Sequence, residues 1–313
     1  MDKIFLPYLQ QIEPHAQFTF NLPIIESSLG TKYFAKVGSL SEREQFVGEA
    51  ESLGAIHNAA PGLAPRVFAA ASPDYSAAQY ERPYFLSEYR NITSLASNFE
   101  AGEKLGTRLA TELHVYKSTM GFGFHVPTFC GATRQDNGWH QTWEGCYSAM
   151  IGGLLVKLHD KGRFSELCTK GEHVRSKVIP YLLRPLEIEP VLLHGDLWSG
   201  NVGIDDSSGQ PVIFDPSSYY GHNEADLAIA RIFGGFPRSF FEKYHEHLPK
   251  TKPVDQYELR ADLYELYHYL NHTVLFGSSY AGSALRKMNT LLGACSCIDN
   301  TRALTQPRTT YHI

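Results

Sequence analysis

Several features that would restrict the class of this protein are scarce in its sequence. Neither sign of charge dominates, because 28 Lys and Arg residues face 33 Asp and Glu residues. This balance excludes the strongly basic surface of nucleic-acid or anionic-membrane binders. No apolar run approaches the roughly 18 residues that a membrane helix needs, and the apolar stretch at the start is too short for a signal peptide. We therefore expect a cytoplasmic protein without nucleic-acid or membrane partners.

Cysteine is also sparse, and no internal repeat or low-complexity linker interrupts the chain. The five cysteines are odd in number and scattered, which is typical of reduced thiols in an intracellular enzyme. They are Cys130, Cys146, Cys168, Cys295 and Cys297. Only the last two are close together, and no second Cys or His pair lies near enough to complete a metal site. This pattern favours reduced cysteines without a structural metal site.

The chain does contain enough apolar sequence for a large core: hydrophobic residues make up 43% of its 313 residues. Periodicity predicts strands at 18–25, 32–37, 67–71 and 83–89, and helices at 40–58, 94–115, 143–164, 172–186 and 257–276. This order predicts a two-lobed α+β enzyme with its cleft near residue 88. We expect a small β-rich N-lobe at 1–88, a larger, mainly helical C-lobe at 89–293, and a poorly ordered tail at 294–313.

One short run carries the clearest chemical signal. Asp196 is followed five positions later by Asn201, and Asp215 ends an apolar, strand-like run fourteen positions beyond. In a kinase catalytic loop with this spacing, the Asp accepts the proton of the acceptor hydroxyl and the Asn holds magnesium; the second Asp holds magnesium too. The alternative is that these residues only cap a turn and end a strand. The combined spacings favour a phosphotransferase.

A kinase also needs a cation for the nucleotide phosphates and a connector for adenine. Lys36 lies on a predicted strand, and Glu49 falls in the next helix beside its buried face, so the pair matches the lysine and glutamate of a bilobal kinase. The alternative is a surface lysine and a solvated helix charge. Glu88, Tyr89 and Arg90 follow a predicted strand, where main-chain groups are expected to bind adenine.

The same region departs from protein kinases in ways that indicate the acceptor. Gly195 replaces the usual Arg, Trp198 stands where a phosphate-steering Lys would be, and Pro216 follows Asp215. Only ten residues separate Asp215 from Asp226, which leaves no room for a long activation loop. We therefore expect the acceptor to be a small molecule, or a small group on a macromolecule, instead of a peptide hydroxyl.

Longer motifs point to one family. They are Leu193-His-Gly-Asp-Leu-Trp-Ser-Gly-Asn201, Phe214-Asp-Pro-Ser-Ser-Tyr-Tyr-Gly-His222, Glu224-Ala-Asp-Leu-Ala228, Phe233-Gly-Gly-Phe-Pro237, Gly123-Phe-His125, Thr128-Phe-Cys-Gly131, Asn137-Gly-Trp139, Trp143 and Tyr269-Leu-Asn-His272. With these motifs, residues 30–292 resemble the fructosamine kinase (ketosamine 3-kinase) family, within the aminoglycoside and choline kinase-like superfamily. The resemblance implies a protein-kinase-like fold and ATP- and Mg²⁺-dependent phosphorylation of the sugar 3-hydroxyl of free or protein-bound ketosamines, including ribulosamines. The unstable product then sheds its sugar, which is deglycation.

Four further residues are candidates for the acceptor pocket: Trp198, Tyr219, Trp143 and Asp226. Trp198 adjoins Asp196, so it is the strongest of the aromatic candidates. The alternative for the other aromatic residues is that they belong to the hydrophobic core or to the wall of the pocket. Asp226 has two possible roles: to contact the substrate, or to brace the catalytic loop. His194 is expected to hold the backbone of that loop.

One departure from the family leaves two other functions open. The family has a Gly-Gly pair in its first hairpin, but residues 17–24 read Gln-Phe-Thr-Phe-Asn-Leu-Pro-Ile. Phe18 and Phe20 cannot approach a phosphate as closely as glycine can, so we expect weaker ATP binding. One alternative is a kinase of another small alcohol, such as an aminoglycoside or choline. The other is a nucleotide-binding pseudokinase, although its five charged or amide groups at 36, 49, 196, 201 and 215 are all present.

Overall fold

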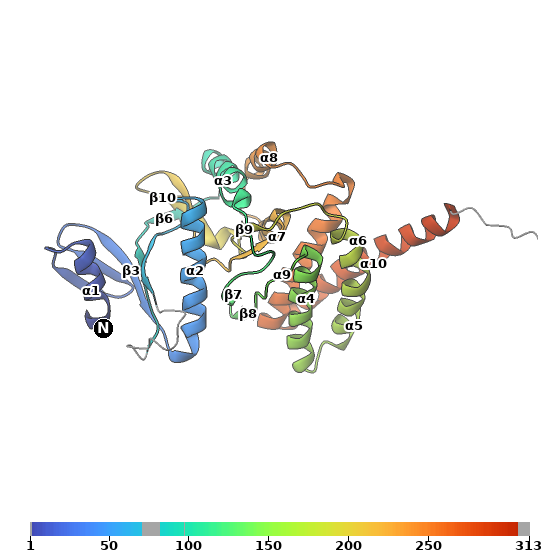
Figure 1. The fold of residues 1–313 in the computed structure, drawn as a ribbon, viewed down its shortest axis with the longest axis horizontal. Coiled ribbons are helices and arrows are strands. Elements are labelled where there is room, and N and C mark those ends of the chain that lie inside the picture. The colour runs from blue at the N-terminus through green and yellow to red at the C-terminus, as the bar shows by residue number, and fades with distance from the viewer. Residues whose placement is uncertain (1, 71–81, 97, 306–313) are drawn as a thin grey trace, which may run out of the picture. The chain divides into compact units, whose positions relative to one another are not determined.

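The computed structural model describes residues 2–70, 82–96 and 98–305. It divides into two compact units that interleave along the chain (Figure 1). Unit 1 comprises Met1–Gln141 and Glu189–Lys250, and unit 2 comprises Thr142–Ile188 and Thr251–Ile313. Among the described residues, no helix combines the length and the apolar character that crossing a membrane requires.

Unit 1 begins with a five-stranded antiparallel sheet in the order β1-β2-β3-β5-β4. The strands are β1 (Phe18–Asn21), β2 (Ile24–Ser27), β3 (Lys32–Val37), β4 (Val67–Ala70) and β5 (Tyr84–Glu88). Helices α1 (Asp2–Ile12) and α2 (Arg43–Ala59), with the 3-10 turn η1 (Leu40–Glu42), flank this sheet (Figure 1). Phe5 and Leu9 of α1 are fully buried against Ile25 and Tyr33, so the first helix completes the core of the sheet.

The first predicted strand is divided in the structure. Instead of one strand over 18–25, β1 and β2 form a hairpin in which Asn21 pairs with Ile24, so Leu22 and Pro23 make the turn. Pro23 has no N–H to donate to a ladder, which favours a turn at this position. Neither residue of this turn is a glycine. The other predicted strands of the sheet are confirmed over their described residues, and Ala71, the last residue of the strand expected at 67–71, lies outside the described residues. The helix predicted over 40–58 is present as η1 followed by α2.

The rest of unit 1 consists of three small β-structures and several helices. The β-elements are β6 (Ile92–Ser94) with β10 (Val202–Asp205) and β11 (Gln210–Ile213), β7 (Thr128–Cys130) with β8 (Thr133–Gln135), and β9 (Val191–Leu193) with β12 (Tyr219–Gly221). The helices are α3 (Phe99–Thr111), η3 (Leu113–Val115), η5 (Ser199–Asn201), α7 (Asn223–Phe233) and α8 (Arg238–His247). Strand β6 was not predicted: the expected helix over 94–115 begins later, because Asn98 caps α3 through the backbone N–H of Ala101.

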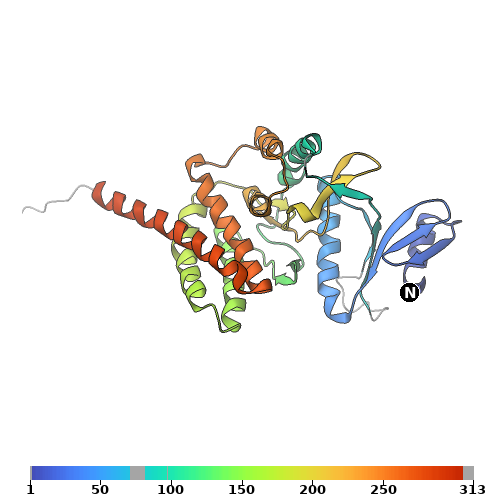
Figure 2. The ribbon, with the colours of Figure 1, turned by 180° about the vertical axis from the view of Figure 1, so that it is seen from behind.

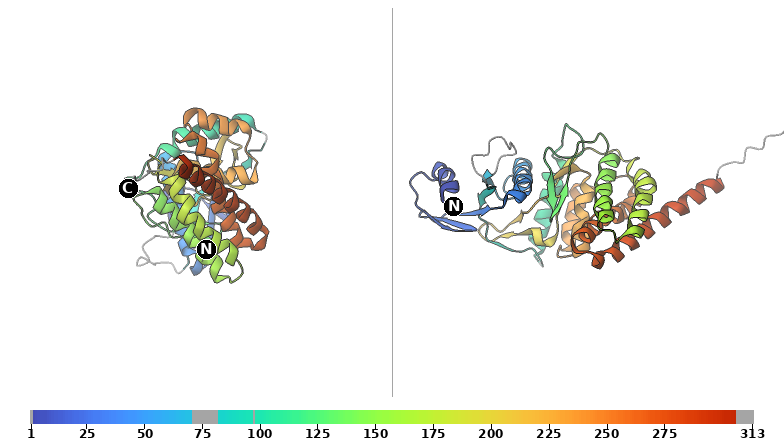
Figure 3. Two further views of the ribbon diagram at one scale, coloured as in Figure 1. Left: turned by 90° about the vertical axis from the view of Figure 1, so that its right-hand side faces the viewer. Right: turned by 90° about the horizontal axis from the view of Figure 1, so that it is seen from below.

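Unit 2 is helical among its described residues, as Figures 2 and 3 show. Its helices are α4 (Trp143–Asp160), α5 (Ser165–His173), η4 (Val174–Val178), α6 (Ile179–Leu183), η6 (Val254–Gln256), α9 (Tyr257–Phe276) and α10 (Ser278–Thr305). Tyr147 of α4 and Tyr264 of α9 are both buried, with ring centroids 5.3 Å apart. Helices α4 and α9 begin at the residues that the sequence predicts, Trp143 and Tyr257.

The compact units do not divide at the predicted lobe boundary. The predicted N-lobe, 1–88, lies inside unit 1 together with 89–141 and 189–250. One reason is that β6, just after the connector, pairs with β10. The lobe boundary therefore stays a prediction. The poorly ordered tail expected at 294–313 also stays a prediction: α10 continues to Thr305 through a stretch containing helix-forming Ala and Leu, and residues 306–313 lie outside the described residues.

Candidate functional site

Unit 1 contains a cavity of about 330 Å³ that is lined mainly by polar and charged side chains. Its lining residues are Lys36, Gln45, Glu49, Phe129, Gly131, Asp196, Trp198, Asn201, Asp215 and Pro216. The volume is within the usual range for small-molecule sites. All five residues that the sequence assigns to phosphate binding, metal binding and proton transfer therefore meet at one cavity, although they are distributed from residue 36 to residue 215.

The cationic side of the cavity is the pair formed by Lys36 of β3 and Glu49 of α2. Lys36 Nζ donates to both carboxylate oxygens of Glu49, at 2.8 and 2.6 Å. Burial raises the pKa of Glu49, while the charge and hydrogen bonds of Lys36 oppose that rise. Lys36 also lies over the rings of Phe46 and Phe85, 5.1 Å from each centroid. The ammonium is thus held in place by the glutamate and two aromatic faces.

The backbone of the catalytic loop is held in place by a buried carboxylate. Asp226 of α7 accepts the N–H of His194 and the N–H of Gly195, both at 2.8 Å. Gly195 has φ +84°, and a Cβ at this position would overlap the carbonyl oxygen of Ser217, so glycine is required here. This geometry gives Asp226 the bracing role, the second of the two that the sequence leaves open.

The brace extends to a second buried histidine. His114 Nε2 lies 3.1 Å from Asp226 Oδ2, and His114 Nδ1 lies 2.7 Å from the hydroxyl of Tyr244. Burial alone would raise the pKa of Asp226, but the hydrogen bond and charge of His114, with His194, hold it below its usual range. Asp226 therefore remains ionised at neutral pH, which lets both of its oxygens accept hydrogen bonds.

His194 orders the loop on the other side. Its Nε2 donates to the carbonyl of Phe214 at 3.0 Å, and its Nδ1 accepts the N–H of Asp196 at 3.2 Å. Burial lowers the pKa of His194, which favours the neutral ring that these two bonds require. His194 therefore has the structural role that the sequence predicts, and it links the strand end before Asp215 to Asp196.

Asp196 has the environment of a group that can accept a proton. Its Oδ2 accepts from Asn201 Nδ2 at 3.2 Å, and its Oδ1 lies 3.6 Å from Cys130 Sγ. Burial raises the pKa of Asp196 to about 6, although the bonds from Cys130 and Asn201 act in the opposite direction. A carboxylate with a pKa near 6 is ionised at neutral pH and is a stronger base than a solvated aspartate.

Asn201 and Asp215 both line the cavity and carry side-chain oxygens that could ligate a cation. Asn201 Nδ2 donates to the backbone carbonyl of Asp196 at 3.0 Å, so the amide oxygen Oδ1 is the atom that can ligate a cation. Asp215 has φ +52°, an uncommon backbone conformation for a residue that precedes proline. Amide and carboxylate oxygens are the ligands that Mg²⁺ prefers, so the donor set fits this ion.

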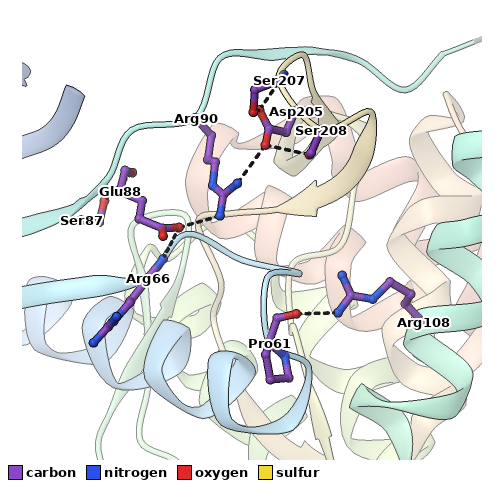
Figure 4. A network of polar contacts seen from close by, with 9 residues as sticks. All are labelled: Pro61, Arg66, Ser87, Glu88, Arg90, Arg108, Asp205, Ser207 and Ser208. Atoms are coloured by element: carbon purple, nitrogen blue, oxygen red, sulfur yellow. Dashed lines mark hydrogen bonds and ion pairs between the residues drawn. The ribbon is translucent and has the colours of Figure 1, made fainter. Parts of the chain in front are cut away.

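The connector after β5 is fixed by its own side chains, as Figure 4 shows. Arg90 Nη2 donates to Glu88 Oε2 at 2.7 Å, and Arg90 Nη1 donates to Asp205 Oδ2 at 2.8 Å. Glu88 also accepts the backbone N–H of Arg66, at 3.2 Å. The side chains of Glu88 and Arg90 are therefore engaged within the protein. Any contact that residues 88–90 make with adenine is expected to come from their main chain.

The three aromatic acceptor-pocket candidates occupy different environments. Trp198 lines the cavity with 38% of its surface exposed, and its ring meets Phe233 edge to face. Tyr219, in contrast, is buried on β12. Trp143 is buried in unit 2, where its Nε1 donates to the hydroxyl of Tyr264 at 2.9 Å. Of the aromatic candidates, Trp198 has the clearest access to the cavity.

Sequence reasoning assigned no role to several residues of this site. Phe129 and Gly131, on either side of Cys130, line the cavity, and so does Gln45 at the start of α2. Residues 128–131 carried a signal, since they belong to one of the family motifs. Because these residues are far from Asp196 along the chain, the sequence did not indicate that they line the same cavity.

Comparison with known proteins identifies the family. The fructosamine kinase family model matches residues 19–294. The mouse protein "Ketosamine-3-kinase" is 38% identical over 286 residues, which cover 83% of this chain and 88% of the mouse protein. "Protein-ribulosamine 3-kinase, chloroplastic" from Arabidopsis thaliana is 44% identical over 183 residues, which cover 58% of this chain and 54% of the plant protein.

Solved structures show the same fold. A candidate fructosamine-3-kinase from Haemophilus somnus matches with a TM-score of 0.73 at 22% identity, covering 91% of this chain and 96% of its own. An aminoglycoside phosphotransferase in a ternary complex with AMP-PNP and hygromycin B matches with a TM-score of 0.56 at 15% identity, covering 92% and 97%. These likenesses confirm the predicted kinase-like α+β fold, and the family match spans most of the chain. The chain belongs to the fructosamine kinase family.

Proposed function

We propose that this kinase transfers the γ-phosphoryl group of ATP to the sugar 3-hydroxyl of ketosamines, free or attached to protein lysines. The observation that carries the proposal is the single cavity in which Lys36, Glu49, Asp196, Asn201 and Asp215 meet. The family match supports the acceptor class: its relatives are named as ketosamine and ribulosamine kinases. Loss of the sugar from the unstable phosphorylated product would make the reaction a deglycation step.

In the proposed reaction, the hydroxyl oxygen of the acceptor forms a bond to the γ-phosphorus, and the bond from that phosphorus to the β–γ bridging oxygen breaks. Asp196 accepts the hydroxyl proton, and ADP leaves with the bridging oxygen. Lys36, oriented by Glu49, compensates charge on the nucleotide phosphates. Asn201 and Asp215 would hold Mg²⁺, which when bound neutralises charge on the phosphates. The protein thus contributes mainly positioning and charge compensation.

Binding of the two substrates is assigned to different parts of the site. Residues 88–90 would bind adenine through main-chain groups, and Trp198 would form part of the acceptor pocket, because it lines the cavity beside Asp196. Tyr219, Trp143 and Asp226 are weaker acceptor candidates because all three are buried. With Leu22 and Pro23 at the tip of the first hairpin, we expect weaker ATP binding than a glycine-tipped hairpin would give. The cytoplasmic location expected from the sequence stays a prediction.

The test is a side-by-side measurement of ATP consumption with fructosyl-lysine, ribulosyl-lysine, choline and kanamycin. The proposal expects turnover with at least one ketosamine and none with choline or kanamycin. Turnover of choline or kanamycin alone would favour a kinase of another small alcohol. Tight binding of Mg-ATP without product from any acceptor would favour a non-catalytic nucleotide-binding protein.

A further inference from the structure

The β7–β8 hairpin contacts helix α2, which carries Glu49, and also lines the cavity that contains Asp196. Strands β7 and β8 pair antiparallel, with Cys130 opposite Thr133. The hairpin packs on α2, the helix that carries Glu49, and its residues Phe129 and Gly131 line the same cavity as Asp196. The hairpin therefore lies where it can determine how the phosphate-binding pair and the proton acceptor are placed relative to each other.

The contact with α2 is closest at Gly48, the residue immediately before Glu49. A Cβ at Gly48 would lie 2.5 Å from the carbonyl oxygen of Pro127 and 3.2 Å from Thr128 Cα. Both are backbone atoms, so a side chain at position 48 could be accommodated only by moving the helix or the strand. Gly48 thus lets the axis of α2 approach the start of β7 closely.

Two polar contacts fix the same helix on either side of Gly48. Arg134 of β8 donates to both oxygens of Glu44, at 2.6 and 3.0 Å, a bidentate geometry that adds directional strength. His125, shortly before β7, lies 2.9 Å from Glu51. These contacts lie on both sides of the segment that carries Glu49, and the bidentate one joins α2 directly to β8.

The other contact of the hairpin is with the catalytic loop. Cys130 is buried, and its Sγ donates to Asp196 Oδ1 at 3.6 Å. The second oxygen of Asp196 accepts from Asn201. The thiol and the amide therefore hold one oxygen each, which fixes the plane of the carboxylate.

We propose that the β7–β8 hairpin is a positioning element that joins α2 to the catalytic loop, through Gly48 and Arg134 on one side and Cys130 on the other. By fixing the position of α2, the hairpin fixes the placement of the Lys36–Glu49 pair relative to Asp196. The inference rests on the proposed function, because it assumes the roles given to Lys36, Glu49 and Asp196.

The test compares two glycines of the same helix. Gly48→Ala places a methyl group against the backbone of β7, whereas the matched control Gly54→Ala meets nothing within 4 Å. Both substitutions gain the same helix propensity, so propensity cannot account for a difference. We expect Gly48→Ala to lower kcat by about tenfold or more and to weaken Mg-ATP affinity in calorimetry, and Gly54→Ala to stay within about twofold of wild type.

A folded Gly48→Ala variant with wild-type kcat and Mg-ATP affinity would overturn the proposal. If Gly48→Ala does not fold, the variant Cys130→Ala tests the proposal instead. We expect Cys130→Ala to lower kcat by about threefold or more and to leave the KM for ATP unchanged. We expect Cys130→Ser to restore kcat. Wild-type kcat in Cys130→Ala would then overturn the proposal. Failure of the proposed function would look different, because wild type and Gly54→Ala would then both be inactive toward every ketosamine.

Discussion

At the scale of single residues, the proposed reaction depends on three side chains that carry oxygen atoms: Asp196, Asn201 and Asp215. Burial, hydrogen bonding and backbone conformation determine their basicity and orientation. Asp196 is made more basic by burial, while Asn201 turns its amide nitrogen toward the carbonyl of Asp196 and so presents its oxygen to the cavity. Asp215 reaches the same cavity from a backbone conformation with positive φ. Asp196 also has a partner that sequence spacing alone does not reveal, the thiol of Cys130.

Replacing Asp215 by Ala should reduce turnover far more than tenfold, because it removes the carboxylate assigned to the metal ion. A tenfold loss corresponds to about 1.4 kcal/mol of barrier. Steady-state kinetics at saturating ATP and Mg²⁺ measure the effect. The control is Asp160→Ala, which removes an exposed carboxylate of unit 2. Activity of Asp215→Ala within tenfold of wild type would refute the metal-binding assignment.

The pH dependence of the reaction should report Asp196. Below its pKa of about 6 the carboxyl group is protonated and cannot accept the hydroxyl proton, so kcat/KM for ATP should fall as the pH decreases through about 6. In kcat the midpoint should be lower, because bound Mg²⁺ favours the ionised carboxylate. A profile measured from pH 5 to 8 that stays flat for both parameters would contradict the assignment.

At the scale of elements, the sequence predicted the parts of the site better than the contacts between them. Strand β3, helix α2 and the catalytic loop follow from periodicity and motif spacing, so Lys36, Glu49 and Asp196 could be predicted. Strand β6 has only three residues, and its pairing with β10 is a long-range contact that local pattern does not contain. Cys130 was hidden for the same reason, since it reaches Asp196 across 66 positions of sequence.

The connector after β5 provides a prediction at this scale. Arg90→Ala should raise the KM for ATP by about threefold to tenfold, because Arg90 joins the connector to Asp205 at the end of β10. Asp205 is 1% exposed, so the loss of its cationic partner should also destabilise the protein by about 1–3 kcal/mol. Kinetics and denaturant unfolding measure both effects.

The matched control is Arg238→Ala, which breaks a pair on the surface of α8 in which the arginine side chain is 90% exposed. Exposed pairs contribute little to stability, so this variant should behave as wild type. Equal KM values for ATP in the two variants would show that the Arg90 network does not position the connector.

At the scale of the whole molecule, the residues that line the cavity all belong to unit 1. A ligand that binds the folded protein stabilises it by about 2.7 kcal/mol at a hundred times its Kd. Mg-ATP should therefore raise the unfolding temperature of unit 1 in calorimetry. The shift should disappear in Asp215→Ala and with AMP, which lacks the β- and γ-phosphates; an equal shift with AMP would contradict phosphate binding at this cavity.

The family could be predicted from sequence because its motifs, concentrated in 193–240, include both catalytic and structural residues of the loop. The division into compact units could not, since the chain passes between them at 142, 189 and 251, and such a division depends on packing over the whole chain. The poor order expected for residues 294–313 stays a prediction, although the backbone of α10 extends to Thr305.

The central claim is that the γ-phosphoryl group of ATP is transferred to the sugar 3-hydroxyl of a ketosamine, with Asp196 accepting the hydroxyl proton. The most direct measurement is a single-turnover reaction with fructosyl-lysine or ribulosyl-lysine, Mg²⁺ and saturating ATP, with the product examined by phosphorus–proton correlation NMR. We predict that the new phosphate couples to the proton on carbon 3, and that Asp196→Asn lowers the rate by about a hundredfold or more. Phosphate on another carbon, or an unchanged rate in Asp196→Asn, would contradict the account.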